Sequence, residues 1–152
     1  AWGRARLGPA GDVAAGLGQA GLEVLEAASD ELPAAERASV RDFLARADMG
    51  LTAADLAIAE TGSLVIVSGP GAPRAVSLLP PCHVAVFGRG ALVPGLEEAG
   101  VVLQAWQCGP PEDGGSNVVF VTGPSRTADI ELTLTRGVHG PKEVHAVFVD
   151  AL

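Results

Sequence analysis

The sequence has few of the residues that build redox centres, disulfide frameworks or strongly charged surfaces. It contains two cysteines and no tyrosine, and charged residues make up only 18% of its 152 positions. Two cysteines are too few thiolates for an iron–sulfur cluster, and they set no disulfide framework. The formal net charge of −8 disfavours binding to nucleic acid or to an acidic membrane surface, because both would repel it. We therefore expect metabolites or proteins as partners.

Targeting and membrane signals are also lacking. No apolar run reaches the roughly 18 residues that span a bilayer, and no basic start followed by an apolar core marks a signal peptide. These absences predict a cytoplasmic protein without a membrane span. The first residue is Ala1 rather than Met, so we expect the N-terminal part of the domain to be incomplete.

The metal-binding residue types do not fall at metal-ligand spacing. Cys82 and Cys108 lie far apart, and the three histidines are scattered along the chain. We interpret Cys82 as a small apolar residue entering a strand. His83 follows it, and a hydrogen-bonded core imidazole and an active-site imidazole explain this residue equally well. His145, within the last predicted strand, is expected to pack. We predict no metal site in this chain.

Hydrophobic residues make up 48% of the chain, which is enough for one folded domain with a sizeable core. Apolar runs alternate with amphipathic segments, which predicts an α/β domain with a largely parallel sheet flanked by helices. Antiparallel pairing within residues 64–87 would make that sheet mixed. The predicted strands are residues 22–25, 49–51, 64–67, 74–79, 83–87, 118–121 and 144–149. The predicted helices are residues 11–20, 34–47, 56–59, 93–99 and 128–136.

Residues 118–136 read as a buried strand, a tight turn and a short helix. Ser125 or Thr127 would cap this helix, because a hydroxyl accepts hydrogen bonds from unpaired amides in the first turn. The same turn also offers backbone amides from Gly123 onward and the Arg126 guanidinium at the carboxyl end of a strand, where α/β sheets bind anionic ligands. A ligand site and simple capping both remain open here.

Three segments together resemble one known family. They are residues 54–64 (ADLAIAETGSL), residues 76–83 (VSLLPPCH), and residues 122–131 (TGPSRTADIE) followed by residues 137–141 (GVHGP). In this order and spacing they are similar to the LUD domain of lactate utilization proteins, in the lactate utilization protein C (LutC/YkgG) group. The resemblance runs from about residue 47 to the C-terminus, and we assign residues 1–152 to one LUD domain.

The resemblance implies a fold like that of ribose-5-phosphate isomerase, glucosamine-6-phosphate deaminase and CoA transferases, called the NagB/RpiA/CoA transferase-like fold. It also implies a place in a three-component system that oxidises L-lactate to pyruvate. In such a system, partner subunits carry the iron–sulfur clusters. This chain would be a component without its own redox centre or cofactor, and whether it catalyses a step itself stays open.

Site residues follow from these segments. Glu60 is the candidate acid, base or nucleophile, and its alternative role is to accept hydrogen bonds from the turn around Gly62. Arg126 either holds a carboxylate or phosphate or pairs with a nearby acid. His139, on a glycine-containing loop, is a candidate for proton transfer. The predicted ligand-binding residues are Thr61, Gly62, Ser63, Gly123, Ser125, Arg126 and Thr127.

Three functional hypotheses remain. The leading one is a LUD-domain subunit that binds a small anionic or nucleotide-like ligand between residues 60–63 and residues 123–127. The second is a stand-alone enzyme, resembling a CoA transferase or an isomerase, that uses Glu60. The third is an assembly or regulatory module whose turns are purely structural.

Overall fold

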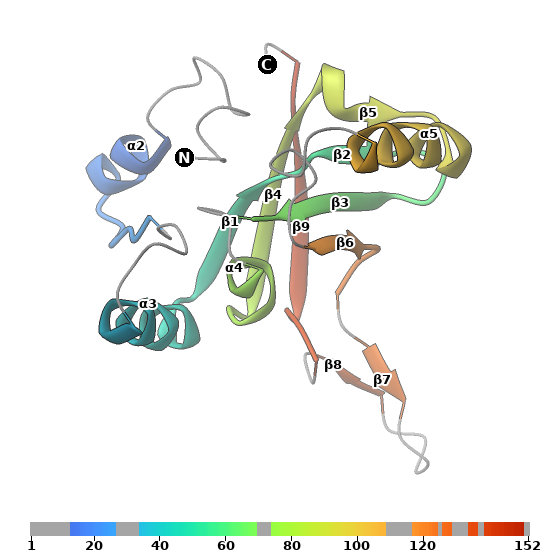
Figure 1. Cartoon of the computed structure of the whole chain (residues 1–152). Coiled ribbons are helices and arrows are strands. Elements are labelled where there is room, and N and C mark those ends of the chain that lie inside the picture. Colours follow the sequence, from blue (N-terminus) through green and yellow to red (C-terminus); the bar gives the residue numbers. More distant parts are fainter. Residues whose placement is uncertain are drawn as a thin grey trace.

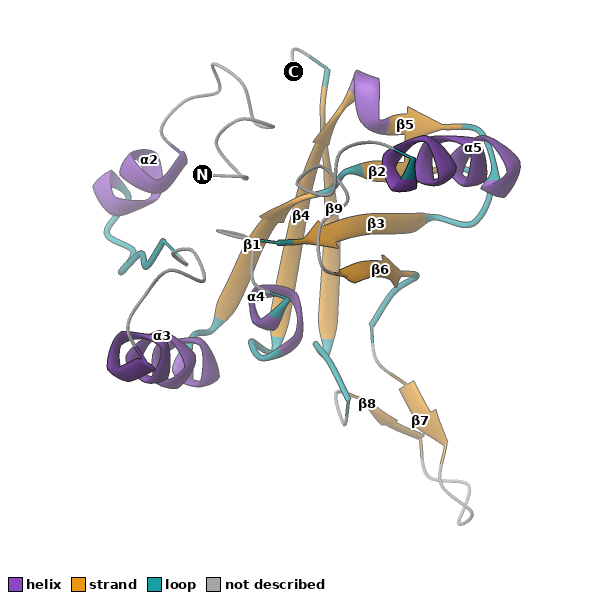
Figure 2. Ribbon diagram, viewed as in Figure 1, coloured by secondary structure: helices purple, strands orange, loops and turns teal. Residues whose placement is uncertain are grey.

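The computed structural model describes residues 13–26, 34–69, 74–108, 117–124, 126–128, 134–136 and 139–150 (Figures 1 and 2). The helices are α2 (Val13–Gln19), α3 (Ala34–Arg46), α4 (Ala75–Leu78) and α5 (Leu96–Gln107), with the 3-10 helix η2 (Arg89–Ala91). The strands are β1 (Met49–Ala53), β2 (Leu56–Ile58), β3 (Ser63–Ser68), β4 (Cys82–Gly88), β5 (Leu92–Val93), β6 (Asn117–Val121), β7 (Arg126–Ala128), β8 (Leu134–Arg136) and β9 (Glu143–Val149).

One sheet consists of three parallel strands in the order β1-β4-β9. Its central strand, β4, pairs with β9 from Cys82 opposite Glu143 to Gly88 opposite Val149. The carboxyl ends of the three strands therefore lie at one edge of the sheet, and their amino ends lie at the other. These strands run side by side in Figure 1.

The second sheet has the order β5-β2-β3-β6 and is mixed. β3 pairs antiparallel with both β2 and β6, whereas β5 runs parallel to β2. Every residue of β3 is buried, as predicted from a run that is apolar on both faces. The predicted α/β domain, with a parallel and partly mixed sheet flanked by helices, is confirmed.

Alternating side chains of the second sheet fill two separate cores. On one face, Leu56, Ile58 and Val65 pack with Ala99 and with other residues of α5. On the other face, Ala57 and Leu64 pack with Ala85 of β4, between the two sheets. Successive side chains of a strand point to opposite faces, so β2 and β3 contribute to both layers. The order of layers is therefore α5, the mixed sheet and the parallel sheet.

Helix α4 lies against β1 at a glycine. A Cβ atom at Gly50 would overlap the carbonyl oxygen of Val76 in α4 and would lie 3.3 Å from Pro80 Cγ. A glycine at this position permits the close approach of helix and strand. The turn that follows α4 then leads directly into β4.

Several predicted elements are wrong, and in each case tertiary packing or pairing opposes the local signal. The helix predicted at residues 128–136 is wrong, because Ala128 and residues 134–136 belong to the antiparallel strands β7 and β8, with Arg126 opposite Arg136. Residues 56–58 form β2 rather than a helix, because all three are buried and pair with β3. Residues 75–78 form α4 rather than part of a returning strand. The antiparallel pairing therefore involves β2 and β6 rather than a strand at residues 74–79.

Other predicted boundaries shift. Residues 22–26 have no regular structure, so the predicted first strand is wrong. The predicted helix at residues 93–99 is instead α5, which begins at Leu96, and Gly100 lies inside it rather than capping it. Among the described strands, β6 lies at an edge of its sheet and is not buried, since Val118 and Phe120 are exposed. The helices predicted at residues 11–20 and 34–47 are confirmed as α2 and α3.

Candidate functional site

Two of the predicted site segments meet at the start of β3. The Thr61 hydroxyl donates a hydrogen bond to Ser63 Oγ at 2.7 Å, and Ser63 Oγ lies 2.8 Å from Thr122 Oγ1. Pairing of β3 with β6 positions the second contact. Glycines with positive φ adjoin both segments, at Gly62 (64°) and Gly123 (119°). Thr61, Ser63 and Thr122 therefore form a continuous chain of hydroxyls, which we call the hydroxyl cluster.

Glu60 caps a helix rather than its own turn. Its side chain is exposed, and its Oε2 accepts a hydrogen bond from the Leu96 amide at 3.3 Å, at the start of α5. Glu98 Oε2 accepts from the Gly95 amide at 3.1 Å. Two carboxylates thus lie at the positive end of the α5 dipole, where negative charge is stabilised. This contact gives Glu60 a structural role that requires no ligand.

The remaining predicted site residues lie elsewhere or outside the described residues. Arg126 and Thr127 belong to β7, in a hairpin that projects away from the two sheets (Figure 1). The structure describes their backbone but not their side chains. Ser125 also lies outside the described residues. Because β7 is a strand, the expected helix N-terminus at this turn is wrong. His139 is exposed in the bend before β9.

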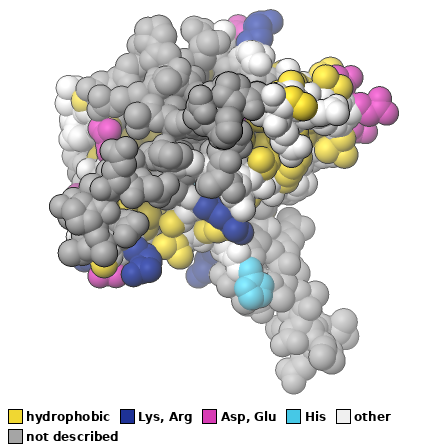
Figure 3. Space-filling view, viewed as in Figure 1, with side chains coloured by type: hydrophobic (Ala, Val, Ile, Leu, Met, Phe, Trp, Pro, Cys, Tyr) yellow, Lys and Arg dark blue, Asp and Glu magenta, His cyan; other side chains and the backbone are white. Residues whose placement is uncertain are grey.

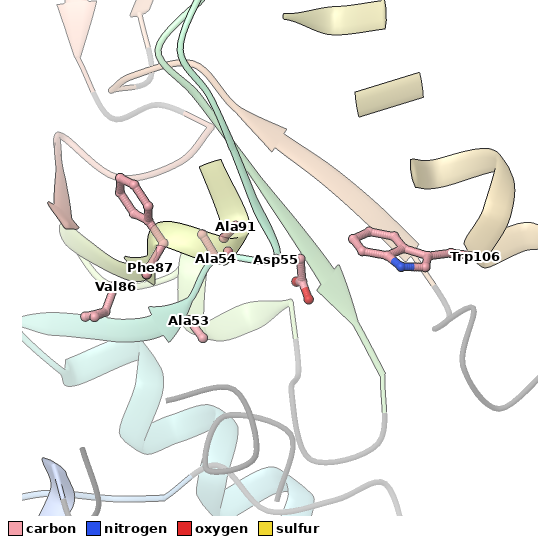
Figure 4. Close-up of a pocket in the computed structure, with 9 residues that line it drawn as sticks. Ala53, Ala54, Asp55, Val86, Phe87, Ala91 and Trp106 are labelled. Atoms are coloured by element: carbon pink, nitrogen blue, oxygen red, sulfur yellow. The ribbon is translucent and has the colours of Figure 1, made fainter. Parts of the chain in front are cut away.

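A cavity of about 320 Å³ opens at the carboxyl ends of β1 and β4. Figure 4 shows the Trp106 indole of α5 pointing towards Asp55, with Val86 and Phe87 on the far side of Asp55. The Asp55 carboxylate is held in place, because its Oδ2 accepts a hydrogen bond from the Val67 amide at 2.7 Å. The lining residues are Ala53, Ala54, Asp55, Val86, Phe87, Gly88, Gly90, Ala91 and Trp106. We call this cavity the β1/β4 pocket.

The position of the β1/β4 pocket follows the general rule for α/β sheets, in which ligands bind beyond the carboxyl ends of parallel strands. From the sequence, this rule was expected to apply at residues 118–121, which belong to the antiparallel strand β6. β1 and β4 were both predicted as strands, but it was not predicted that they pair as neighbours in one parallel sheet. Gly88 and Gly90, at the end of β4, were the sequence signal that could have located the pocket.

A cation lies beside the β1/β4 pocket. Arg89, between the lining residues Gly88 and Gly90, donates from Nε to Asp150 Oδ1 at 3.0 Å, and its Nη2 approaches the same oxygen at 2.5 Å. Both side chains are exposed, so solvent weakens this ion pair. The guanidinium therefore remains accessible to solvent, although Arg89 itself does not line the pocket.

His83 is a core residue. Its side chain is fully buried, and its Nε2 lies 2.9 Å from Thr52 Oγ1 of the neighbouring strand. Burial lowers the pKa of His83 from 6.5 to about 4, because the charged form loses its hydration. The imidazole is therefore neutral near pH 7. Among the described residues, His83 contacts none of the predicted site residues through a hydrogen bond.

Cys82, Glu143 and His145 come together on the opposite face of the parallel sheet from His83. One potential ligand atom from each lies within 4.8 Å of the other two. His145 Nε2 and Glu143 Oε2 are 3.6 Å apart. His145 is exposed, so the expectation that it packs is wrong. Sequence spacing could not reveal this group, because strand pairing alone brings Cys82 next to Glu143.

One glycine pattern in the sequence acquires a clear structural context. Gly16, Gly18 and Gly21 have the spacing GxGxxG, but they lie within α2 and the turn after it. A dinucleotide fingerprint instead joins a strand to a helix, so these glycines do not form one.

In the described part of the chain, no helix is long and apolar enough to cross a membrane.

Comparison with known proteins gives a consistent result. Residues 6–149 match the family model of the LUD domain. The chain is 41% identical over 115 residues to a protein named lactate utilization protein C from an Exiguobacterium species, covering 74% of this chain and 48% of that protein. It is 37% identical over 110 residues to a protein of the same name from a Geobacillus species, covering 72% of this chain and 45% of that protein. The chain thus spans about half the length of these relatives.

A solved structure supports the fold. The crystal structure of a DUF162 family protein from Deinococcus radiodurans superposes with a TM-score of 0.52 at 22% sequence identity. The superposition covers 88% of this chain and 80% of that protein. At this identity the likeness concerns the fold alone.

Proposed function

Because the chain belongs to the LUD domain family, we propose that it serves in lactate utilization by binding a nucleotide-like or other small anionic ligand in the β1/β4 pocket. It works as a cytoplasmic subunit beside partners that carry iron–sulfur clusters. Oxidation of L-lactate to pyruvate releases two electrons and two protons, and the electrons pass to those clusters. The two cysteines of this chain supply no such centre.

The position of the β1/β4 pocket is the observation that supports this proposal best. Its aromatic residues, Trp106 and Phe87, offer apolar faces for a planar ring. The backbone at Gly88 and Gly90 allows a ligand to approach closely. Arg89 lies between these glycines and pairs with a carboxylate in solvent, a contact that a ligand phosphate or carboxylate can replace. Ring and anion would therefore be bound by neighbouring parts of one pocket.

The hydroxyl cluster is the second candidate ligand site. Thr61 and Thr122 are exposed, and their hydroxyls can hydrogen-bond a small anion at the end of β3. Gly62 and Gly123 leave the adjoining backbone accessible. Among the described residues, no lysine or arginine side chain forms a hydrogen bond with this cluster, so the β1/β4 pocket, with Arg89 nearby, has the stronger electrostatic support.

The two alternative functions make different demands on the chain. A stand-alone transferase or isomerase would require Glu60 to leave the α5 cap and act as a nucleophile or base. Turnover by the purified chain, lost in Glu60→Gln, would support that function. A purely structural module would bind no small ligand, and its pocket variants would leave the activity of the assembled system unchanged.

A thermal-shift screen of the purified chain tests the proposal. The ligands are lactate, pyruvate, phosphate, nucleotides, flavins and CoA. A ligand that binds only the folded state at 100 times its dissociation constant adds about 2.7 kcal/mol to the free energy of unfolding. We expect a nucleotide-like ligand to raise the unfolding midpoint, and Arg89→Gln to reduce that rise for ligands that carry an anionic group.

Matched variants locate the site. Ala91→Phe fills the β1/β4 pocket, and Ala105→Phe adds the same side chain at an exposed position of α5. We expect ligand stabilisation to disappear in Ala91→Phe and to persist in Ala105→Phe. Equal loss in both variants, or loss only in Thr122→Val, would contradict binding in the β1/β4 pocket. Lactate oxidation by the chelator-treated chain alone would contradict the proposed dependence on partner subunits.

A further inference from the structure

We propose that Cys82, Glu143 and His145 bind a single divalent transition-metal ion, with Zn²⁺ as the best match. The site would lie at the amino ends of β4 and β9, on the solvent-facing side of the parallel sheet. It is distinct from the β1/β4 pocket, which lies at the carboxyl end of β4. The proposal does not depend on the proposed function in lactate utilization, and it departs from the sequence-based expectation of no metal site.

The donor set selects the class of metal. A cysteine sulfur, an imidazole nitrogen and a carboxylate oxygen are the ligand types that Zn²⁺ uses in proteins. Mg²⁺ and Ca²⁺ prefer oxygen ligands, so the sulfur and nitrogen donors disfavour them. Three protein ligands leave one position of a tetrahedral site for water. The arrangement therefore corresponds to an open zinc site rather than to a closed structural one.

The distances are close to those of a metal site. In a tetrahedral zinc site, bond lengths of about 2.0–2.3 Å place neighbouring ligand atoms roughly 3.3–3.7 Å apart. Glu143 Oε2 and His145 Nε2 are already 3.6 Å apart. One carboxylate oxygen of Glu143 and one ring nitrogen of His145 lie within 4.8 Å of the Cys82 sulfur. Both β9 side chains are exposed, so small rotations of them can close the remaining gap to Cys82 without moving the backbone.

The backbone fixes the three residues on one face. Cys82 pairs with Glu143 in the parallel register of β4 and β9. Glu143 and His145 are two residues apart along β9, so their side chains point to the same side of the sheet. The carbonyl oxygen of Pro81 also accepts hydrogen bonds from the amides of Lys142 at 2.7 Å and Glu143 at 3.1 Å. The start of β9 is therefore attached to the start of β4 before any metal binds.

Local electrostatics gives the metal a role. The Cys82 sulfur and the Glu143 carboxylate lie close together at this site. A bound cation would offset the repulsion between a thiolate and this carboxylate, and the thiol proton would pass to solvent because the metal binds the thiolate. It would also crosslink β9, an edge strand among the described residues, to the central strand β4. Zinc binding should therefore stabilise this sheet.

Titration of the metal-free full chain with Zn²⁺ and, as a spectroscopic probe, Co²⁺ tests this site. We expect one equivalent of Zn²⁺ to bind, to release protons and to raise the unfolding midpoint. Bound Co²⁺ should show the intense near-ultraviolet absorption of a cobalt–thiolate bond. Cys82→Ser should abolish this absorption and weaken Zn²⁺ binding at least tenfold. His145→Gln, at an exposed position, should weaken binding to a similar extent without unfolding the chain.

The second cysteine provides the matched control. Cys108→Ser removes an exposed thiol beyond the end of α5 and should leave Zn²⁺ affinity and the Co²⁺ spectrum unchanged. The proposal is overturned if the native chain binds no Zn²⁺, if binding is equally strong in Cys82→Ser and His145→Gln, or if Cys108→Ser removes the thiolate absorption. Far-ultraviolet circular dichroism of each variant verifies that the fold is retained.

Discussion

The hydroxyl oxygens of Ser63 and Thr122 lie 2.8 Å apart, although 59 positions separate the two residues in the chain. This contact joins the turn after β2 to the end of β6, and Thr61 extends it at 2.7 Å. Ser63 is buried, so its hydroxyl must find partners within the protein. The contact connects two segments that sequence analysis had linked only through a family resemblance.

The first prediction concerns this contact. Ser63→Ala should lower the free energy of unfolding by about 1–2 kcal/mol, because it removes a buried hydroxyl that bonds two partners. Thr122→Val should cost less, about 0.5–1 kcal/mol, since Thr122 is exposed to water. Urea denaturation of the single and double variants forms a double-mutant cycle, which should give a coupling energy of about 0.5 kcal/mol or more. Ser39→Ala, an exposed hydroxyl on α3, is the control. Strictly additive losses would show that the contact contributes nothing.

The second prediction concerns the pH dependence of stability. His83 has a pKa of about 4 in the folded state and about 6.5 when unfolded, so the unfolded chain binds the proton first as the pH falls. The contribution of His83 is fully present above pH 6.5 and is lost as the pH falls towards 4. The loss should amount to roughly 2 kcal/mol at pH 5 relative to pH 8.

Chemical denaturation between pH 5 and pH 8 measures this effect. The slope of stability against pH should be shallower in His83→Gln than in the native chain, even if that variant is less stable throughout. Ser39→Ala, at an exposed position of α3 without a titratable side chain, should keep the native slope. Identical slopes in the native chain and His83→Gln would show that His83 does not titrate between these pH values.

The third prediction compares two glycines. Gly50→Ala places a methyl group against the Val76 carbonyl oxygen, so α4 or β1 must shift, at a cost of about 1–3 kcal/mol. Gly100→Ala, inside α5 and with no atom near its added Cβ, should instead stabilise the chain by about 0.5–1 kcal/mol. Thermal unfolding of both variants measures these changes in stability. A Gly50→Ala variant as stable as the native chain would contradict the close contact between α4 and β1.

The fold was predictable where the local signal and the tertiary environment agree. Residues 64–67 are apolar on both faces, and β3 is indeed covered by α5 on one side and the parallel sheet on the other. The prediction failed where they disagree. Thr52 and Asp55 have the spacing of a capping box, yet the following residues pair with β3 because that buries Leu56, Ala57 and Ile58.

The candidate sites show the same division. Thr61, Ser63 and the segment that contains Thr122 were recognised from the sequence. The β1/β4 pocket was not, because it depends on which strands become neighbours in the parallel sheet. The Cys82, Glu143 and His145 group depends on one particular register between β4 and β9. Such register cannot be read from spacing along a chain, since any one-residue slip would send Glu143 and His145 to the other face.

The last prediction separates a structural from a chemical role for Glu60. Its carboxylate accepts the Leu96 amide at the N-terminus of α5, where both a hydrogen bond and a negative charge are favourable. Glu60→Ala should therefore destabilise the chain by about 1 kcal/mol. Glu60→Gln keeps an acceptor but loses the charge, so it should cost about half as much at low salt and less at high salt. Glu97→Gln, in the first turn of the same helix, provides a charge-matched control.

Urea denaturation at two salt concentrations checks this ranking. The native chain alone could instead show turnover, which Glu60→Gln abolishes without changing stability. Glu60 would then act on a substrate, and this result would support the transferase or isomerase function. If both variants match the native chain in stability and in activity, the contact with Leu96 is incidental. The capping role requires the order native, Glu60→Gln, Glu60→Ala, from most to least stable, because hydrogen bond and charge are then lost one after the other.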